Sequence, residues 1–308
     1  MAAETATETR TLRGAPGAAT LYPRAVAGAL PLVGRLPLIG RRGGGALPDL
    51  ALALPDVTLE PGRVADYARV CGFAIRDELP ATYLHVLAFP LAMALMTDRS
   101  FPFGVLGLIH VANRIDHLRP VRLGERPTLR VHAEGLRAHP KGRQFDVVAV
   151  AAVEGERVWE GRSTYLRQGG GDRDGDAQGA GTKTKTSNTS GERPEPPEPE
   201  ALWTVPGDTG RRYAAVSGDR NPIHLHDLSA KAFGMPRAIA HGMWLKARCL
   251  AALDPELPAA FAVEVRFKRP VLLPATVGFS SAATTGGRRF ALHDARRGAP
   301  HLEGQLGD

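Results

Sequence analysis

In the C-terminal part of the chain, one long apolar run is followed by several short ones. Residues 239–253 are rich in Ala, Leu and Met, with no proline before Pro255, and this composition over a helical length predicts a mostly buried helix. Separated by Pro and Gly, apolar or alternating runs of strand length follow at 263–267, 276–280 and 289–293. The pattern predicts one central helix wrapped by antiparallel strands.

The N-terminal part repeats this order. Residues 83–96 form an apolar region of helical length, and strand-like runs follow near 128–133, 145–153 and 158–166. Because strand follows strand without a helix between them, a doubly wound parallel sheet is not expected. We predict an α+β fold in which two antiparallel sheets each wrap a central helix.

The two parts also share short stretches of sequence. Residues 67–72 (YARVCG) match residues 213–218 (YAAVSG), 146 positions later, and residues 115–121 (IDHLRPV) match residues 265–271 (VRFKRPV), 150 positions later. Two similar offsets in the same order indicate a duplication. The duplicated units are expected to pair about a pseudo-twofold axis.

Composition divides the chain into four segments. Residues 1–45 are rich in Ala, Thr, Gly and Arg without a sustained period, and we expect a loosely ordered arm there. Residues 168–200 are dominated by Gly, polar residues and then Pro, so they cannot bury apolar surface and predict a flexible linker. The remaining segments, 46–167 and 201–308, are each long enough to fold around one sheet and one helix.

Charge and cysteine content narrow the classes of partner. Lys and Arg number 39 against 32 Asp and Glu, but the basic residues are scattered, so nucleic acid is not the expected partner. A net charge of +7 suits a polyanionic small ligand or an acidic carrier protein. Cys71 and Cys249 lie far apart and no metal-type spacing is present, so neither a disulfide framework nor a metal site is predicted.

The longest early apolar stretch, residues 25–40, is interrupted by Pro31, Arg35 and Pro37 and is too short to cross a bilayer. It also lacks a convincing signal-peptide cleavage pattern. Together with the unpaired cysteines, this predicts a cytoplasmic protein without a membrane span.

The candidate chemistry lies in residues 213–224 (YAAVSGDRNPIH). Gly218 permits one turn and the Asn-Pro pair favours a second, so Asp219 and His224 are expected to converge from one loop. A carboxylate and an imidazole at one point can share a water molecule and pass protons in both directions. Each residue alone also fits a structural role, Asp219 as a helix cap and His224 as a hydrogen-bonded core or surface histidine.

The order of these residues resembles a known signature. Residues 213–224, followed by 239–243 (IAHGM), are similar to the motif of the MaoC-like or (R)-specific enoyl-CoA hydratase family, whose fold is the hot dog. The two-part architecture, with residues 101–103 (FPF) and 119–120 (RP), resembles the double-hot-dog 3-hydroxyacyl-thioester dehydratases of actinobacteria. The resemblance covers about residues 50–300.

This resemblance implies roles for individual residues. Asp219 and His224 would be the catalytic pair, and the backbone N–H of Gly242, at the start of the central helix, would face the thioester carbonyl. A helix N-terminus presents free N–H groups and a positive dipole end, which suits a developing enolate oxygen. His241 would be a structural hydrogen-bonding residue behind the loop. The full set of supporting residues is Ser217, Asn221, His241 and Gly242.

The first unit departs from the motif. An offset of 146 places Phe73 and Glu78 at the positions of Asp219 and His224, so that unit is expected to do something other than the chemistry. A proline inside the apolar run 83–96 predicts an interrupted helix, whose freed space would hold the acyl chain. The residues assigned to this pocket are Pro90, Ala94, Phe103 and Gly104. The alternative is that the aromatic residues simply pack the core.

Two basic residues near the end of a predicted strand are candidates for binding CoA phosphates or a carrier's phosphopantetheine arm. Arg266 and Lys268 would share the face opposite Val265 and Phe267 if the alternation of the strand continues. An ordinary solvated strand face is the alternative.

The sequence therefore predicts a reversible dehydratase that converts (3R)-hydroxyacyl-CoA or hydroxyacyl-carrier-protein thioesters to trans-2-enoyl thioesters in fatty-acid metabolism, without metal or other cofactor. An acyl-CoA thioesterase, whose carboxylate would activate water against the carbonyl carbon, is one alternative. A non-catalytic acyl-thioester-binding or assembly subunit is another. The expected assembly is a monomeric pseudo-dimer or a homodimer.

Overall fold

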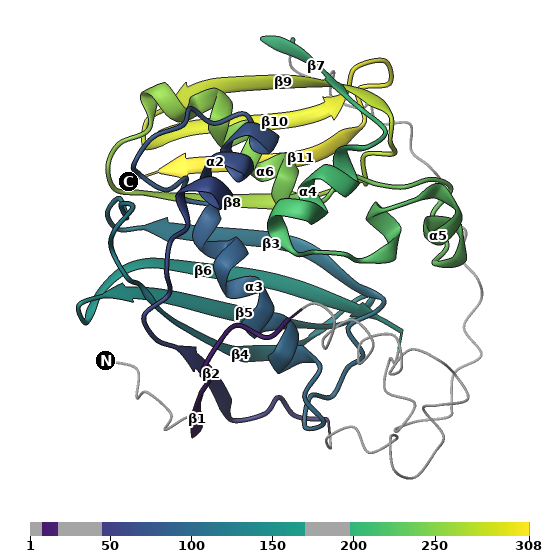
Figure 1. Cartoon of the computed structure of the whole chain (residues 1–308). Coiled ribbons are helices and arrows are strands. Elements are labelled where there is room, and N and C mark those ends of the chain that lie inside the picture. Colours follow the sequence, from purple (N-terminus) through teal and green to yellow (C-terminus); the bar gives the residue numbers. More distant parts are fainter. Residues whose placement is uncertain (1–7, 18–44, 170–197, 308) are drawn as a thin grey trace, which may run out of the picture.

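The computed structural model describes residues 8–17, 45–169 and 198–307. All strands of this described part belong to one 11-stranded sheet, and its order is β1-β2-β4-β5-β6-β3-β8-β11-β10-β9-β7 (Figure 1). Apart from the parallel pair of β1 and β2, neighbouring strands are antiparallel.

The first unit consists of two helices and a five-stranded part of the sheet. Its helices are α2 (Pro61–Cys71) and α3 (Tyr83–Met96), and α3 has the bounds that the apolar run predicts. The strands are β2 (Leu50–Leu54), β3 (Leu108–His117), β4 (Thr128–His139), β5 (Gly142–Val153) and β6 (Glu156–Gln168). Helix α3 packs against β2, β4 and β5, so the sheet wraps it.

The second unit repeats this arrangement. Its helices are α4 (Thr209–Ser217), the 3₁₀ turn η2 (Pro222–His224), α5 (Asp227–Ala232), α6 (Gly242–Leu253) and η3 (Asp254–Glu256). The strands are β7 (Ala201–Val205), β8 (Phe261–Phe267), β9 (Ala275–Thr284), β10 (Gly287–Asp294) and β11 (Pro300–Gly307). The central helix starts at Gly242 rather than at 239, because Ile239 forms a β-bridge with Leu272.

The two units join edge to edge through β3 and β8. Arg114 pairs with Glu264, which lies 150 positions later, so each strand pairs with its own repeat across a pseudo-twofold axis. Helices α2 and α4 pack on each other near this axis, where the buried rings of Tyr67 and Tyr213 lie 6.2 Å apart. The double hot dog, with its units paired about a pseudo-twofold axis, is thereby confirmed.

Buried polar contacts also connect the units. Lys246 of α6 is fully buried, and its ammonium donates to the side chain and backbone carbonyl of Asn113 in β3 (2.6 and 3.2 Å) and to the Val263 carbonyl (3.1 Å). Trp244 Nε1 donates to the Val70 carbonyl of the first unit at 3.0 Å. Because a buried polar group without partners costs free energy, these bonds fix how α6 sits across the junction.

Two expectations about the first unit need correction. Helix α3 is continuous through Pro90, although proline lacks the N–H that would bond four residues back. Burial of both sides of this helix against the sheet and α4 outweighs the missing bond. Within the arm at 1–45, Glu8–Thr11 form β1, which pairs in parallel with β2 and extends the sheet by one strand. Residues 170–197 of the expected linker lie outside the described residues.

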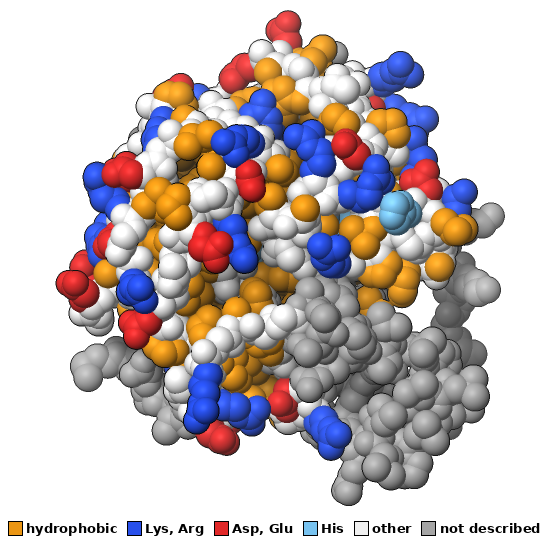
Figure 2. Space-filling model, in the orientation of Figure 1, with side chains coloured by type: hydrophobic (Ala, Val, Ile, Leu, Met, Phe, Trp, Pro, Cys, Tyr) orange, Lys and Arg blue, Asp and Glu red, His pale blue; other side chains and the backbone are white. Residues whose placement is uncertain are grey.

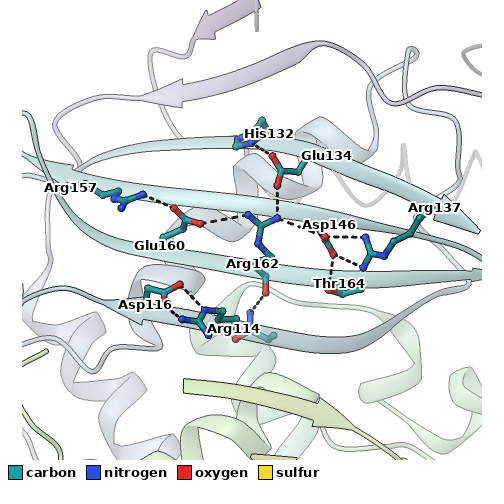
Figure 3. Close-up of polar contacts among 11 residues, drawn as sticks. Arg114, Asp116, His132, Glu134, Arg137, Asp146, Arg157, Glu160, Arg162 and Thr164 are labelled. Carbon is teal, nitrogen blue, oxygen red and sulfur yellow. Dashed lines mark hydrogen bonds and ion pairs between the residues drawn. The ribbon is translucent and has the colours of Figure 1, made fainter. Parts of the chain in front are cut away.

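The face of the first unit's sheet that does not contact α3 is polar. Arg162 forms ion pairs with Glu134, with Asp146 at 3.7 Å and with Glu160 at 3.7 Å, while Arg137 binds Asp146 at 3.0 Å (Figure 3). Figure 2 shows Lys and Arg side chains interspersed with Asp and Glu on one face of the molecule, without a large cationic cluster. No helix in the described ranges is both long enough and apolar enough to cross a membrane.

Candidate active site

The loop after α4 holds the predicted carboxylate. Gly218 ends the helix in the left-handed conformation (φ 75°), which glycine adopts without strain. The backbone N–H of Asp219 then donates to Ser217 Oγ at 3.2 Å, and the N–H of Asn221 donates to Asp219 Oδ1 at 3.1 Å. The Asn221 side chain accepts from the N–H of Ile223 and begins η2. Three local hydrogen bonds thus fix the loop that carries Asp219.

His224 ends η2 and is buried. Its Nδ1 lies 2.8 Å from the Ile239 carbonyl oxygen, which can only accept, so Nδ1 carries the proton in the neutral ring. Burial lowers the pKa of His224, against an opposing effect of Asp219. The ring is therefore neutral near pH 7, and Nε2 retains a lone pair that can accept a proton.

His241 immediately precedes α6 and stacks on His224, with ring centroids 3.7 Å apart. Its Nε2 donates to the Asp219 carbonyl at 3.0 Å and lies 3.8 Å from Asp219 Oδ2. Burial and the neighbouring His224 lower the pKa of His241 to about 3, although Asp219 opposes this. A neutral His241 can stack closely on His224 without charge repulsion and holds the backbone of Asp219.

Two glycines allow other groups to approach this loop closely. A Cβ on Gly210 in α4 would lie 1.9 Å from the His224 carbonyl oxygen, so no larger residue fits there without displacing η2. A Cβ on Gly242 would lie 2.9 Å from the Phe267 ring. Gly242 begins α6, whose first N–H groups have no acceptor within the helix. These groups can bind an oxygen atom that develops negative charge.

A cavity of about 370 Å³ connects the two units. The second unit contributes Asp219, His224, His241 and Gly242 to its lining. The first unit contributes mainly apolar side chains of α3, of the segment before β3 and of the start of β3, which are Val86, Phe89, Met93, Met96, Val105, Leu106 and Leu108. The cavity therefore combines the polar loop of the second unit with apolar walls to which both units contribute.

Comparisons with known proteins agree with this arrangement. Residues 186–304 match the MaoC-like domain family. A protein of Mycobacterium tuberculosis named 3-hydroxyacyl-thioester dehydratase X is 37% identical over 279 residues, which cover 91% of this chain and 94% of that protein. The chain belongs to the MaoC-like dehydratase family.

Solved structures of the MaoC-like dehydratases share the architecture. The crystal structure of HtdX from Mycobacterium tuberculosis, at 35% identity, matches 84% of this chain and 100% of that chain with a TM-score of 0.72. A MaoC-like dehydratase from Phytophthora capsici is 18% identical and shows the same fold, with a TM-score of 0.66 over 83% of this chain and 94% of that chain.

Within this MaoC-like architecture, the pocket residues predicted in the first unit do not line the cavity. Its wall is formed by Phe89, Met93 and Met96, which recur at helical spacing, whereas Pro90 and Ala94 lie on another side of α3. Phe103 stacks on Phe145, with centroids 5.5 Å apart, and so packs the core as the alternative proposed. Gly104 is also absent from the lining, which continues instead with Val105.

The two predicted basic residues have their charged groups on one face at the end of β8, as the alternation of the strand predicts. Lys268 is among the residues that line the cavity, and its ammonium pairs with Glu303 at 2.8 Å. Glu303 stands opposite Arg266 in the register of β8 and β11, and both lie with Glu264 on the outer surface of the sheet. The ammonium of Lys268 therefore lies at the outer edge of the site.

Three polar residues of the first unit that were not predicted from the sequence also line the cavity, which are His85, His110 and Tyr165. His110 and Tyr165 stand in adjacent strands, with ring centroids 4.8 Å apart. The available signal was a single histidine, His85, at helical spacing from the apolar residues of α3.

Among the described residues, Asp219, His224 and His241 also form a group whose ligand atoms lie within 4.8 Å of one another. Carboxylate and imidazole are suitable ligands for a divalent cation such as Zn²⁺. Both histidines already use one ring nitrogen on a backbone carbonyl. The absence of a metal therefore stays a prediction, which metal analysis and chelation of the purified protein would test.

Proposed function

We propose that this chain catalyses the reversible dehydration of (3R)-hydroxyacyl thioesters to trans-2-enoyl thioesters in fatty-acid metabolism, with Asp219 and His224 as its acid/base pair. The observation that carries the proposal is the convergence of a carboxylate, a neutral histidine and a helix N-terminus at one end of an apolar cavity. The name of the Mycobacterium tuberculosis relative supports the same reaction.

The geometry allows Asp219 and His224 to act together in moving protons. In the hydration direction, a water molecule held between Asp219 and His224 bonds through its oxygen to C3 and loses a proton to the pair. The electrons of the C2–C3 bond move toward the thioester carbonyl, and a proton from the pair reaches C2. Water is added across the double bond and the enzyme returns to its starting protonation state. Dehydration is the reverse.

The thioester oxygen gains negative charge during either direction. Placed at the start of α6, it would accept a hydrogen bond from the N–H of Gly242 and face the positive end of the helix dipole. This interaction strengthens as the charge develops, so it lowers the barrier rather than merely binding the substrate.

The remaining cavity fits the rest of the substrate. The apolar walls suit an acyl chain, and Lys268 at the lining suits the phosphates of CoA or of a carrier's phosphopantetheine. We place the reaction in the cytoplasm, with CoA or acyl-carrier-protein thioesters as substrates and without a cofactor.

One experiment separates this function from its alternatives. The purified chain is incubated with crotonyl-CoA and a longer trans-2-enoyl-CoA, and three quantities are followed: the conjugated-thioester absorbance, free CoA thiol, and the chirality of the product. Loss of absorbance with a (3R)-hydroxyacyl product and no free thiol is expected. Free thiol as the main product would identify a thioesterase, and saturable binding without turnover would identify a non-catalytic binding subunit.

A further inference from the structure

The apolar wall that α3 contributes to the cavity begins with a histidine. His85 lies four residues before Phe89, which is followed at helical spacing by Met93 and Met96, and all four line the cavity. His85 is the one polar member of this row, so the row presents a polar group at one end and apolar side chains along the rest.

His85 has ring nitrogens available for a ligand. Neither nitrogen has a hydrogen-bond partner within the described part of the chain, and neither is among the buried unpaired atoms there. The side chain is only partly buried although it stands deep in the structure, because the cavity gives access to it. A polar group that reaches a cavity without a protein partner is suited to bind a substrate atom.

The ring of His85 stands beside a fixed aromatic cluster. His110 of β3 stacks near it, with centroids 6.4 Å apart and planes 13° from parallel. His110 is in turn held by Tyr165 at 4.8 Å and by Phe267 of the second unit at 5.0 Å. The position of His85 is thus restricted by residues from both units.

His85 is also near the reacting end of the cavity, because its neighbour His110 packs on Phe267 at 5.0 Å and the Phe267 ring lies against Gly242. Burial lowers its pKa to about 4, with a further lowering by Lys246, and the Asp219 carboxylate is near enough to oppose these effects. The ring is therefore neutral near pH 7 and offers one donor and one acceptor. Such a ring can donate to a thioester carbonyl or accept from a 3-hydroxyl group without adding charge to the cavity.

We propose that His85 is a substrate-contacting residue, whose ring hydrogen-bonds an oxygen of the bound acyl thioester while the chain extends along Phe89, Met93 and Met96. The inference rests on the proposed dehydratase function. It gives the first unit, which lacks the acid/base pair, a direct polar part in orienting the substrate for the second unit.

The test compares His85→Phe, which keeps a planar ring without polar atoms, with His85→Gln, which keeps a donor and an acceptor. His117→Phe is the matched control, because His117 is another histidine of the first unit with a ring nitrogen that has no protein partner. It packs on Phe261 at 5.0 Å and lines a different cavity. Hydration of crotonyl-CoA and of a ten-carbon enoyl-CoA, and dehydration of the hydroxyacyl products, are measured with the melting temperature of each variant.

For His85→Phe we expect about a tenfold loss of kcat/KM, the size of one hydrogen bond, equal for short and long acyl chains. His85→Gln should recover part of it, and His117→Phe should retain wild-type activity. The loss of kcat/KM must be the same in both directions, because their ratio is the equilibrium constant. A rise of KM for the hydroxyacyl substrate alone assigns the contact to the 3-hydroxyl, and a rise of KM for both substrates assigns it to the carbonyl.

The proposal is overturned if folded His85→Phe keeps wild-type kcat/KM, or if the loss grows with chain length, which would indicate an apolar packing role. It is also overturned if His85→Gln, folded, is no better than His85→Phe. An inactive wild-type chain would instead overturn the dehydratase function, so the two failures are distinguishable.

Discussion

Two cavities of nearly equal size, about 370 Å³ and about 390 Å³, are each lined by residues of both units, and only the first contains the proposed acid/base pair. The second cavity is lined by Phe73 and Glu78, which stand at the repeat positions of Asp219 and His224. Glu78 accepts a hydrogen bond from Arg122 at 2.6 Å, so its carboxylate is already used in an ion pair. The two cavities are related by the fold but differ in chemistry.

The residues that precede the two central helices differ in the same way. Thr82 precedes α3 and accepts a hydrogen bond from Tyr67 at 2.8 Å, whereas His241 precedes α6 and contacts the ring of Tyr213, with centroids 4.9 Å apart. In both units a buried tyrosine contacts the residue that precedes the central helix. Both units therefore retain the helix and the sheet, while the proposed acid/base residues occur only in the second unit.

The largest effect should come from removing the acid/base pair. Asp219→Asn and His224→Ala should each lower kcat by on the order of a hundredfold or more, the usual contribution of a positioned acid or base. Glu78→Gln, at the repeat position of His224, should leave kcat and the pH–rate profile unchanged. Steady-state kinetics on folded variants check this, and a loss in Glu78→Gln similar to that in His224→Ala would mean that both cavities take part in the chemistry.

The next effect concerns the glycine at the second position of α4 and of α2, the two helices that pack on each other. Gly210→Ala in α4 places a Cβ 1.9 Å from the His224 carbonyl, and the resulting shift of η2 should lower kcat by up to about a hundredfold. Gly62→Ala in α2 meets no atom within 4 Å and should be neutral or stabilise its helix by up to about 1 kcal/mol. Thermal unfolding and kinetics of both variants measure the difference. Equal activities would show that the position of His224 tolerates the shift.

The comparison also shows what the sequence could predict. The helix 83–96 and the strands near 128–133, 145–153 and 158–166 could be found because apolar runs of helical or strand length mark them. The repeat offset of 150 reappears in the structure as the pairing of Arg114 with Glu264. Asp219 and His224 could be grouped because one short loop carries both. These features depend on residues that are neighbours in the sequence.

Other parts of the site depend on contacts between distant segments. Proline alone predicts a broken helix, but packing against the sheet keeps α3 continuous, and this changes which of its residues face the cavity. His110 reaches the cavity only because β3 pairs with β8 of the other unit. Neither fact has a local sequence signal.

A smaller effect should distinguish the two units by their role in chain binding. Met93→Trp fills the apolar part of the cavity and should lower kcat/KM for substrates of about ten or more carbons, because each excluded methylene loses about 0.8 kcal/mol of burial. Crotonyl-CoA should be largely spared. Met93→Leu, which conserves volume, is the control and should behave as wild type at all lengths. Equal losses at every length would point to damaged packing instead.

The smallest expected effect concerns the charged rim of the active cavity. Lys268 lines it and is partly exposed, so Lys268→Gln should raise KM for acyl-CoA by a few-fold at low ionic strength and leave kcat almost unchanged. Added salt should shrink the difference, because screening weakens the contact with the phosphates. Arg266→Gln removes the same charge two residues away, at a position that does not line the cavity, and should leave KM unchanged. If both variants raise KM equally, the effect comes from the net charge of the protein, and Lys268 makes no specific contact with the substrate.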